Sequence, residues 1–135
     1  MKRLILASVL LTSVAFASGE NKKLDNLHQA QTMQNLETAM ATIQKGFLYN
    51  NTSLVKDGIT KLKINIEDIQ DFKIENNKDL KFDAQKYAKA EMGAIKILAG
   101  EIMKDFDVGK KEKVLEGFQK TLNRCVTCHL IIRQW

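Results

Sequence analysis

The sequence predicts an all-α protein that folds as an antiparallel four-helix bundle. The chain of 135 residues contains no proline, so proline interrupts no run of helical hydrogen bonds. Apolar residues recur at spacings of three and four, which is the period of a helix with one apolar face. Polar stretches divide this pattern into four segments. Helices of roughly 20 to 26 residues with short connections pack most simply as an antiparallel bundle.

The first two predicted helices are separated by residues 50–53, Asn-Asn-Thr-Ser, which interrupt the apolar pattern and offer an N-cap. The apolar seam of the first helix consists of Met33, Leu36, Met40, Ile43 and Phe47. The seam of the second helix consists of Val55, Ile59, Leu62, Ile66 and Ile69, and it ends in the polar stretch of residues 75–79. We expect both seams to face the core.

The third and fourth predicted helices are separated by Asp107-Val108-Gly109, which predicts a turn. The seam of the third helix consists of Ala88, Met92, Ile95, Ala99, Ile102 and Phe106. The seam of the fourth consists of Leu115, Phe118, Leu122, Cys125, His129 and Ile132. Three glycines lie inside predicted helices, where they either allow a close approach or only loosen the helix: Gly58, Gly93 and Gly100.

The most informative motif is Cys125-Val126-Thr127-Cys128-His129, in the fourth predicted helix. Cys-x-x-Cys-His is the attachment pattern of a c-type haem. Two thiols three residues apart on a helix can each form a thioether with a haem vinyl group, and the adjacent imidazole can bind the iron. The motif therefore predicts one covalent haem c, anchored by Cys125 and Cys128, with His129 as the proximal ligand of the iron. Since Cys125 and His129 take core positions, we expect the haem inside the bundle.

Other interpretations of this motif have less support in the sequence. A thioredoxin-like redox pair requires a βαβ context, and no strand-like run lies near Cys125. A zinc site requires about four protein ligands, and the only other histidine of the chain is His28. A disulfide between Cys125 and Cys128 is possible in an oxidising compartment, but it would close a loop too short to stabilise the fold much.

The N-terminus predicts export. Two basic residues precede an apolar run from Leu4 to Val14, which is too short to span a bilayer comfortably, and Ala15-Phe16-Ala17 has the form of a cleavage site. We therefore expect residues 1–17 to be a cleaved secretory signal peptide and residues 18–135 to form one domain. For a bacterial protein with c-type haem, export means the periplasm.

The charge of the chain does not predict nucleic-acid binding. Removal of Lys2 and Arg3 with the signal peptide lowers the number of Lys and Arg from 21 to 19 against 16 acidic residues, so the net charge falls from +5 to +3. The basic residues are scattered, and no aromatic residues interleave with them. No acid–base pair stands out near the cysteine motif, so we do not expect an enzyme.

Taken together, these features resemble the class II cytochromes c, the cytochrome c′ family, which are exported four-helix bundles with Cys-x-x-Cys-His near the end of the last helix. The resemblance covers the layout of residues 18–135 and is sharpest over residues 107–133. The family often has a basic residue four positions after the haem histidine, so the resemblance implies that Arg133 belongs to the proximal side of the haem site. The first helix departs from the family. Many members have Arg-Gln about one turn before the distal residue, whereas the comparable stretch from His28 to Met33 contains no arginine, and this leaves the haem propionates without an assigned partner.

The sixth ligand of the iron decides the function. No residue after His129 can bind iron, so this ligand must come from upstream. In an antiparallel bundle the N-terminal half of the first helix is level with the motif, and Met33 lies on its inward seam at or near the family's distal position. We expect Met33 to be the distal ligand, with His28 or an open site as the alternatives. Met40 lies about 10 Å deeper along the helix and is expected in the core.

Imidazole and thioether ligation gives a low-spin iron that suits electron transfer. We therefore expect a periplasmic carrier of single electrons that exchanges them with redox partner proteins. An open sixth position would instead favour the binding of NO or CO, for gas binding or NO protection. The family also forms homodimers through its first two helices, and Ile64, which lies off its seam, agrees with a homodimer.

Overall fold

The computed structural model describes residues 14–74 and 82–133, with side chains from residue 21 onward. These ranges contain four α-helices and one 3-10 helix, α1 (Val14–Leu48), α2 (Thr52–Asn65), η1 (Ile66–Asp71), α3 (Ala84–Asp107) and α4 (Lys111–Arg133). The prediction of an all-α fold with four helices is confirmed. Residues 1–13 of the predicted signal peptide lie outside the described residues. Within the described ranges, no helix is long and apolar enough to cross a bilayer.

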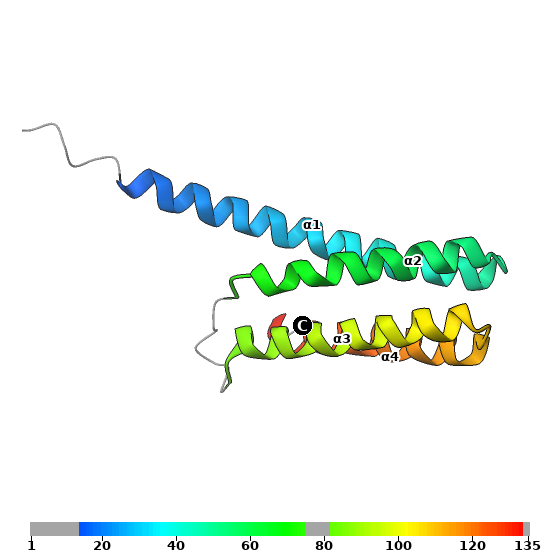
Figure 1. The fold of residues 1–135 in the computed structure, drawn as a ribbon. Coiled ribbons are helices and arrows are strands. Elements are labelled where there is room, and N and C mark those ends of the chain that lie inside the picture. Colours follow the sequence, from blue (N-terminus) through cyan, green and yellow to red (C-terminus); the bar gives the residue numbers. More distant parts are fainter. Residues whose placement is uncertain (1–13, 75–81, 134–135) are drawn as a thin grey trace, which may run out of the picture.

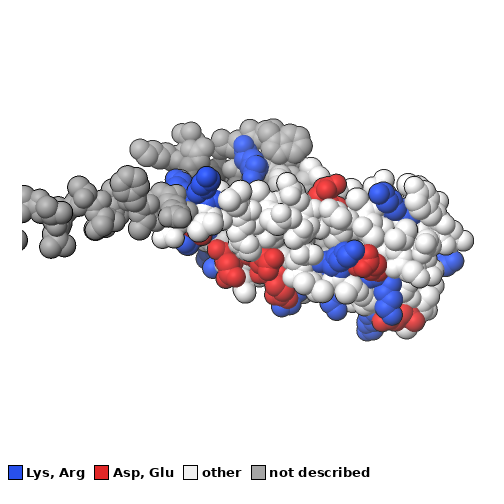
Figure 2. Space-filling model, turned by 90° about the horizontal axis from the view of Figure 1, so that it is seen from above, with Lys and Arg blue, Asp and Glu red and all other residues white. Residues whose placement is uncertain are grey.

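The helices form two antiparallel pairs that lie in two layers (Figure 1). α1 packs along α2, and α3 packs along α4. Contacts from α2 and η1 to α3 join the two layers, whereas α1 and α4 touch over only a short stretch. The bundle is therefore closed between α1 and α2 and open between α1 and α4. Figure 2 shows that charges of both signs are interspersed on the face seen from the α1–α2 side, in agreement with the scattered charges of the sequence.

Tight turns join the helices of each pair at the two positions that the sequence predicts. Asn51 is the N-cap of α2, and its side chain accepts a hydrogen bond from the backbone N–H of Leu54 at 3.1 Å. Gly109 follows α3 with a φ of 74°, a conformation that costs glycine little. The N–H of Lys110 then donates to the carbonyl of Asp105 at 2.9 Å, which closes the end of α3.

The seams predicted for the first three helices form most of the hydrophobic core. Twelve of their residues are buried, and a few others, Met33 and Met92 among them, are half-buried against this core. The buried members are Leu36, Met40, Ile43, Val55, Ile59, Leu62, Ile66, Ile69, Ala88, Ile95, Ala99 and Ile102. Helical periodicity therefore identified the inward faces of α1, α2 and α3 correctly.

The seam predicted for the fourth helix is wrong at two positions. Leu115 and Leu122 are 43% and 44% exposed, and the residues directly before them, Val114 and Thr121, are buried instead. The reason is that α4 packs mainly on α3 and has few contacts with α1, so its buried face is turned toward α3. The hydroxyl of Thr121 is satisfied within the helix, where it donates to the carbonyl of Gly117 at 2.9 Å.

The expected helix lengths hold for α3 and α4 but are wrong for α1 and α2. α1 has 35 residues, and its first four belong to the segment expected to be cleaved. α2 has 14 residues and ends at Asn65, whose side-chain amide donates to the carbonyl of Lys61 at 2.7 Å. η1 continues the chain with 3-10 geometry, in which residues three apart share one face. Ile66 and Ile69 therefore stay on the core side even though the α-helix has ended.

Close approach of α1 and α2 explains one of the three glycines inside predicted helices. A Cβ on Gly58 would lie 2.8 Å from the backbone nitrogen of Ile43 and 2.9 Å from the carbonyl oxygen of Ala39. Gly93 and Gly100 have no heavy atom within 4 Å of such a Cβ, so they serve no close approach in the described structure.

Candidate functional site

A large cavity lies between the two helix pairs. Its volume is about 1110 Å³, slightly above the range of about 300–1,000 Å³ that is typical of ligand pockets. Much of its wall is apolar and comes from α1, η1, α3 and α4, namely from Leu36, Met40, Ile66, Ile69, Ile95 and Phe118. The exposed residues Glu37, Gln44, Leu122 and Val126 line its side on α1 and α4, where the two helices barely touch.

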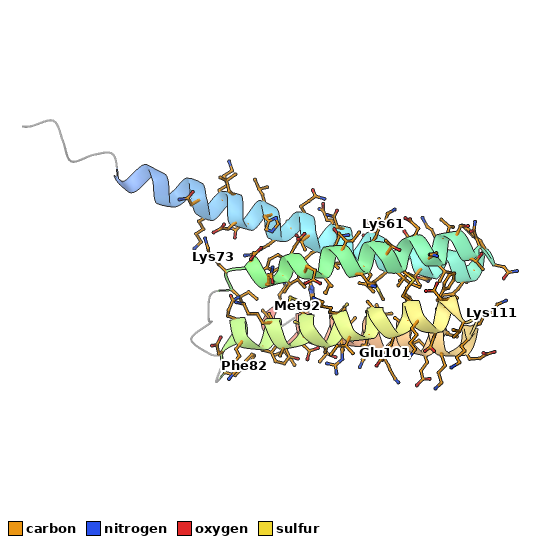
Figure 3. All side chains as sticks on the ribbon, in the orientation of Figure 1. Lys61, Lys73, Phe82, Met92, Glu101 and Lys111 are labelled. Atoms are coloured by element: carbon orange, nitrogen blue, oxygen red, sulfur yellow. The ribbon has the colours of Figure 1, made fainter. Side chains whose placement is uncertain are left out.

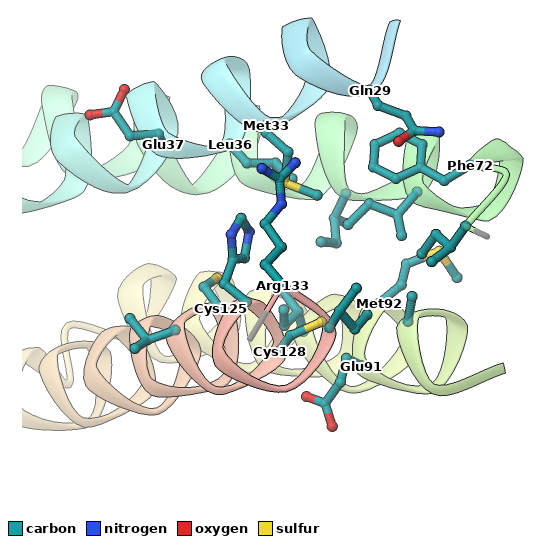
Figure 4. A pocket seen from close by; sticks show the side chains of 18 of the residues that line it. Gln29, Met33, Leu36, Glu37, Phe72, Glu91, Met92, Cys125, Cys128 and Arg133 are labelled. Atoms are coloured by element: carbon teal, nitrogen blue, oxygen red, sulfur yellow. The ribbon is translucent and has the colours of Figure 1, made fainter. Parts of the chain in front are cut away.

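α4 contributes the cysteine–histidine motif to the wall of this cavity. Cys125, Cys128 and His129 all line it, and all three are half-buried. Residues three and four apart share one face of a helix, so a single face of α4 presents both thiols and the imidazole. The two thiols are free (Figure 4).

Burial sets the protonation states of the motif. It raises the pKa of Cys125, and it raises the pKa of Cys128 to about 11, with a further contribution from the nearby carboxylate of Glu91. Burial also lowers the pKa of His129, and the positive charge of Arg133 lowers it further. At neutral pH the thiols are therefore protonated, and the imidazole is neutral with one nitrogen available as a metal ligand.

α1 supplies the opposite wall, where the three residues considered for the sixth position differ in placement. Met33 is half-buried and lines the cavity, facing α4 in Figure 4. Met40 also lines the cavity but is only 7% exposed and packs within the core. His28 is exposed and is not among the residues that line the cavity; its ring contacts the edge of Phe72, with 6.1 Å between the ring centroids. The structure therefore brings Met33 to the same cavity as the motif.

Arg133 lies at the end of α4, one turn after His129, and it also lines the cavity. Its side chain extends from α4 toward Met33 in Figure 4. The residue is exposed, and its guanidinium forms no hydrogen bond or ion pair with another described residue.

An ion pair behind the motif was not predicted from the sequence. Arg124 donates two hydrogen bonds to the carboxylate of Glu91, at 2.9 and 3.2 Å, and so ties α4 to α3 directly beside Cys125. The Glu91 side chain is only 17% exposed. The two residues are 33 positions apart on different helices, and no local sequence pattern signals such a pair.

Met92, which was expected in the core, is a further methionine that lines the cavity from α3 (Figures 3 and 4).

One part of the cavity wall is polar, and we call it the polar rim. It consists of Asn21, Lys22, Asp25, Asn26 and Gln29 on α1, together with Lys73 after η1. Nζ of Lys73 donates to Asp25 at 2.7 Å, and the side-chain amide of Gln29 donates to the carbonyl of Lys73 at 3.2 Å. The N–H of Ile74 donates to the side chain of Gln85 on α3 at 2.8 Å. The segment after η1 is therefore tied to both layers.

Comparison of the chain with protein-family models, with curated proteins and with solved structures gives no match. The motif and the cavity that it lines are therefore the features that indicate a function.

Proposed function

We propose that this protein is a periplasmic, monohaem class II cytochrome c that carries single electrons between redox partner proteins. The observation that supports the proposal most directly is that Cys125, Cys128 and His129 all line one cavity of about 1110 Å³. The same five-residue motif on a helix face without adjacent space would leave no room for a haem. Residues 18–135 would be the exported domain, and residues 1–17 its signal peptide.

The chemistry of the cavity fits this cofactor. A porphyrin is a flat apolar ring with two carboxylates, and the cavity combines largely apolar walls with the polar rim. The ordered α4 surface presents two thiols and one neutral imidazole on one face, which is the donor set that the motif requires. When bound, the haem iron supplies reversible one-electron chemistry.

The residues of α4 have distinct roles in this proposal. Cys125 and Cys128 would hold the haem through two thioethers, each formed by addition of an S–H group across a vinyl double bond without a leaving group or an oxidant. His129 would bind the iron through its neutral nitrogen, and Arg133 would act on the imidazole through its charge. The pair of Arg124 and Glu91 keeps this part of α4 fixed on α3.

Met33 is the residue that we propose as the distal ligand, because it lines the cavity from the helix opposite the motif. Its thioether would exclude other ligands and favour electron transfer. A Met33 side chain turned away from the iron would leave a site for NO or CO, and this gas-binding cytochrome is the alternative function.

A homodimer through α1 and α2 stays a prediction, and Ile64 is 63% exposed on α2.

Expression of the full chain together with a cytochrome c maturation system tests the proposal. We expect a periplasmic product that starts near residue 18, carries one haem by mass, and gives the pyridine haemochrome spectrum of a haem with two thioethers. The variant Cys125→Ser/Cys128→Ser should carry no covalent haem. A wild-type product without covalent haem would refute the proposal.

The absorption spectrum of the loaded protein then separates the two functions. A low-spin spectrum that CO does not change, with a methionine–iron band that Met33→Ala removes, supports electron transfer. Leu36→Ala, on the same wall of the cavity, should keep that band. A high-spin spectrum that shifts when CO is added to the ferrous protein would refute ligation by Met33 and favour gas binding.

A further inference from the structure

The charged and polar side chains around the cavity are concentrated at the polar rim. The rim carries two ammonium groups, on Lys22 and Lys73, and one carboxylate, on Asp25, together with three side-chain amides. Its formal charge is therefore positive, and it faces an interior that is mostly apolar. A ligand that satisfies both parts of the cavity is amphiphilic, with its anionic groups at the rim.

Hydrogen bonds fix the position of Lys73 in the rim. Its ammonium donates to Asp25 at 2.7 Å, and its backbone carbonyl accepts from Gln29 at 3.2 Å. The adjacent N–H of Ile74 donates to Gln85 at 2.8 Å, which holds the same segment against α3. The backbone at Lys73 is therefore held from both layers of the bundle.

The ammonium group of Lys73 has N–H donors that Asp25 does not use. A lysine ammonium carries three N–H donors, and only one of them is used by Asp25. The Lys73 side chain is 75% exposed, so the remaining donors are accessible from the cavity mouth and from solvent. An ammonium that one carboxylate holds in place can bind a second carboxylate with little loss of side-chain freedom.

We propose that Lys73 binds a carboxylate of the ligand in the cavity, and that Asp25 is the positioning residue for its ammonium group. The inference rests on the proposed function, in which these carboxylates are the haem propionates. Lys73, positioned by Asp25, then does what the resemblance would assign to an arginine on the first helix, since residues 28–33 of this chain contain no arginine. Figure 3 shows Lys73 at the end of the α2–η1 segment, beside α1.

Three other charged groups around the cavity, those of Arg133, Glu91 and Glu37, are less suited to this task. Arg133 has no hydrogen bond or ion pair with a described residue that would fix its guanidinium. Glu91 is neutralised by Arg124, and Glu37 repels a carboxylate. The charged side chains that line the cavity are Lys22, Asp25, Glu37, Lys73, Glu91 and Arg133.

The reduction potential of the haem-loaded full chain, measured from about pH 4 to about pH 9, tests the inference. Ionisation of a propionate lowers the potential, and the pH of this fall reports the propionate pKa. Lys73→Met should raise that pKa by about one unit and lower the potential above it, because a cation beside the carboxylate is lost. Asp25→Asn should shift both quantities in the opposite direction, which a merely structural defect would not do.

Lys61→Met is the matched control, since Lys61 is an exposed lysine that also pairs with an aspartate at 2.7 Å but does not line the cavity (Figure 3). Its titration should match that of the wild type. A loaded Lys73→Met protein that titrates like this control overturns the assignment and leaves the cytochrome proposal standing. A shift produced by Arg133→Met instead would assign the carboxylate to Arg133. Absence of covalent haem in the wild type, read from the haemochrome spectrum, would overturn both proposals.

Discussion

The interface between α1 and α2 is closely packed, whereas the space between α1 and α4 contains a large cavity. Toward α2, α1 comes so close that a Cβ on Gly46 would lie 2.6 Å from the backbone nitrogen of Val55, and Gly58 meets Ile43 and Ala39 in the same manner. Toward α4, α1 makes few contacts and leaves a cavity of about 1110 Å³. The first interface is closed by the protein alone, whereas the second leaves space that, in our proposal, a ligand fills.

The size of the cavity sharpens this contrast. A volume of about 1110 Å³ has room for many water molecules, and exposed residues of α1 and α4 line one side of the cavity. Water can therefore enter it when no ligand is bound.

The largest expected effect comes from leaving the haem out, and it should fall on one half of the molecule. In Cys125→Ser/Cys128→Ser, we expect backbone amides of residues 121–133 to exchange with solvent at least about tenfold faster than in the loaded protein. Amides around Ile43 and Ile59 should keep their protection, because α1 and α2 need no ligand to pack. Hydrogen exchange followed by mass spectrometry measures both regions, and equal loss in the two would contradict the contrast.

A substitution at the closed interface should have the next largest effect. Gly58→Ala places a methyl group against the backbone of α1, where neither helix can yield easily, and should lower the free energy of unfolding by about 1–3 kcal/mol. Gly93→Ala is the matched control, since nothing lies within 4 Å of its Cβ. It should raise the free energy of unfolding by about 0.5–1 kcal/mol through helix propensity. Urea denaturation measures both, and a stable Gly58→Ala protein would show that the interface is not rigid.

The closed half of the molecule is also the half that the sequence predicted best. The apolar seams of the first two helices and the N-cap at Asn51 follow from local patterns, because each depends on neighbouring residues. The end of α2 at Asn65 was missed, since the apolar spacing continues unchanged through the 3-10 helix to Ile69. The spacing of apolar residues does not distinguish an α-helix from a 3-10 helix that buries the same face.

The open half contains features that local sequence patterns do not predict. α4 has apolar residues at both Val114 and Leu115, so spacing alone allowed either face, and packing on α3 decided for Val114. The pentapeptide at Cys125 identified α4 as the wall of a site, and the alternating direction of the helices placed Met33 opposite it. The contacts of Lys73 and Glu91 were not predictable, because each joins residues more than 30 positions apart.

Removal of the ion pair between Arg124 and Glu91 should give a smaller, local loss in the open half. Arg124→Gln leaves the Glu91 carboxylate, 17% exposed, without its two charged hydrogen bonds, and should cost about 1 kcal/mol once solvent screening at the 43% exposed arginine is considered. Lys61→Gln, which breaks an exposed pair within α2, should cost less. Thermal unfolding of the haem-loaded variants compares the two, and equal losses would mean that the pair does not fix α4.

The smallest expected effect belongs to a cluster outside both regions. Lys113 and Lys120 hydrogen-bond to Glu116 on α4 and lower the pKa of its carboxyl to about 2. A carboxyl whose pKa falls on folding stabilises the folded state above its unfolded pKa, and this contribution disappears as the pH falls through about 2. Glu116→Gln should therefore lower the Tm slightly at neutral pH, by less than Arg124→Gln does, and leave it unchanged near pH 2. Thermal unfolding at both pH values measures this difference. A loss at neutral pH as large as that of Arg124→Gln would show that surface charges, and not the contact beside the cavity, fix α4.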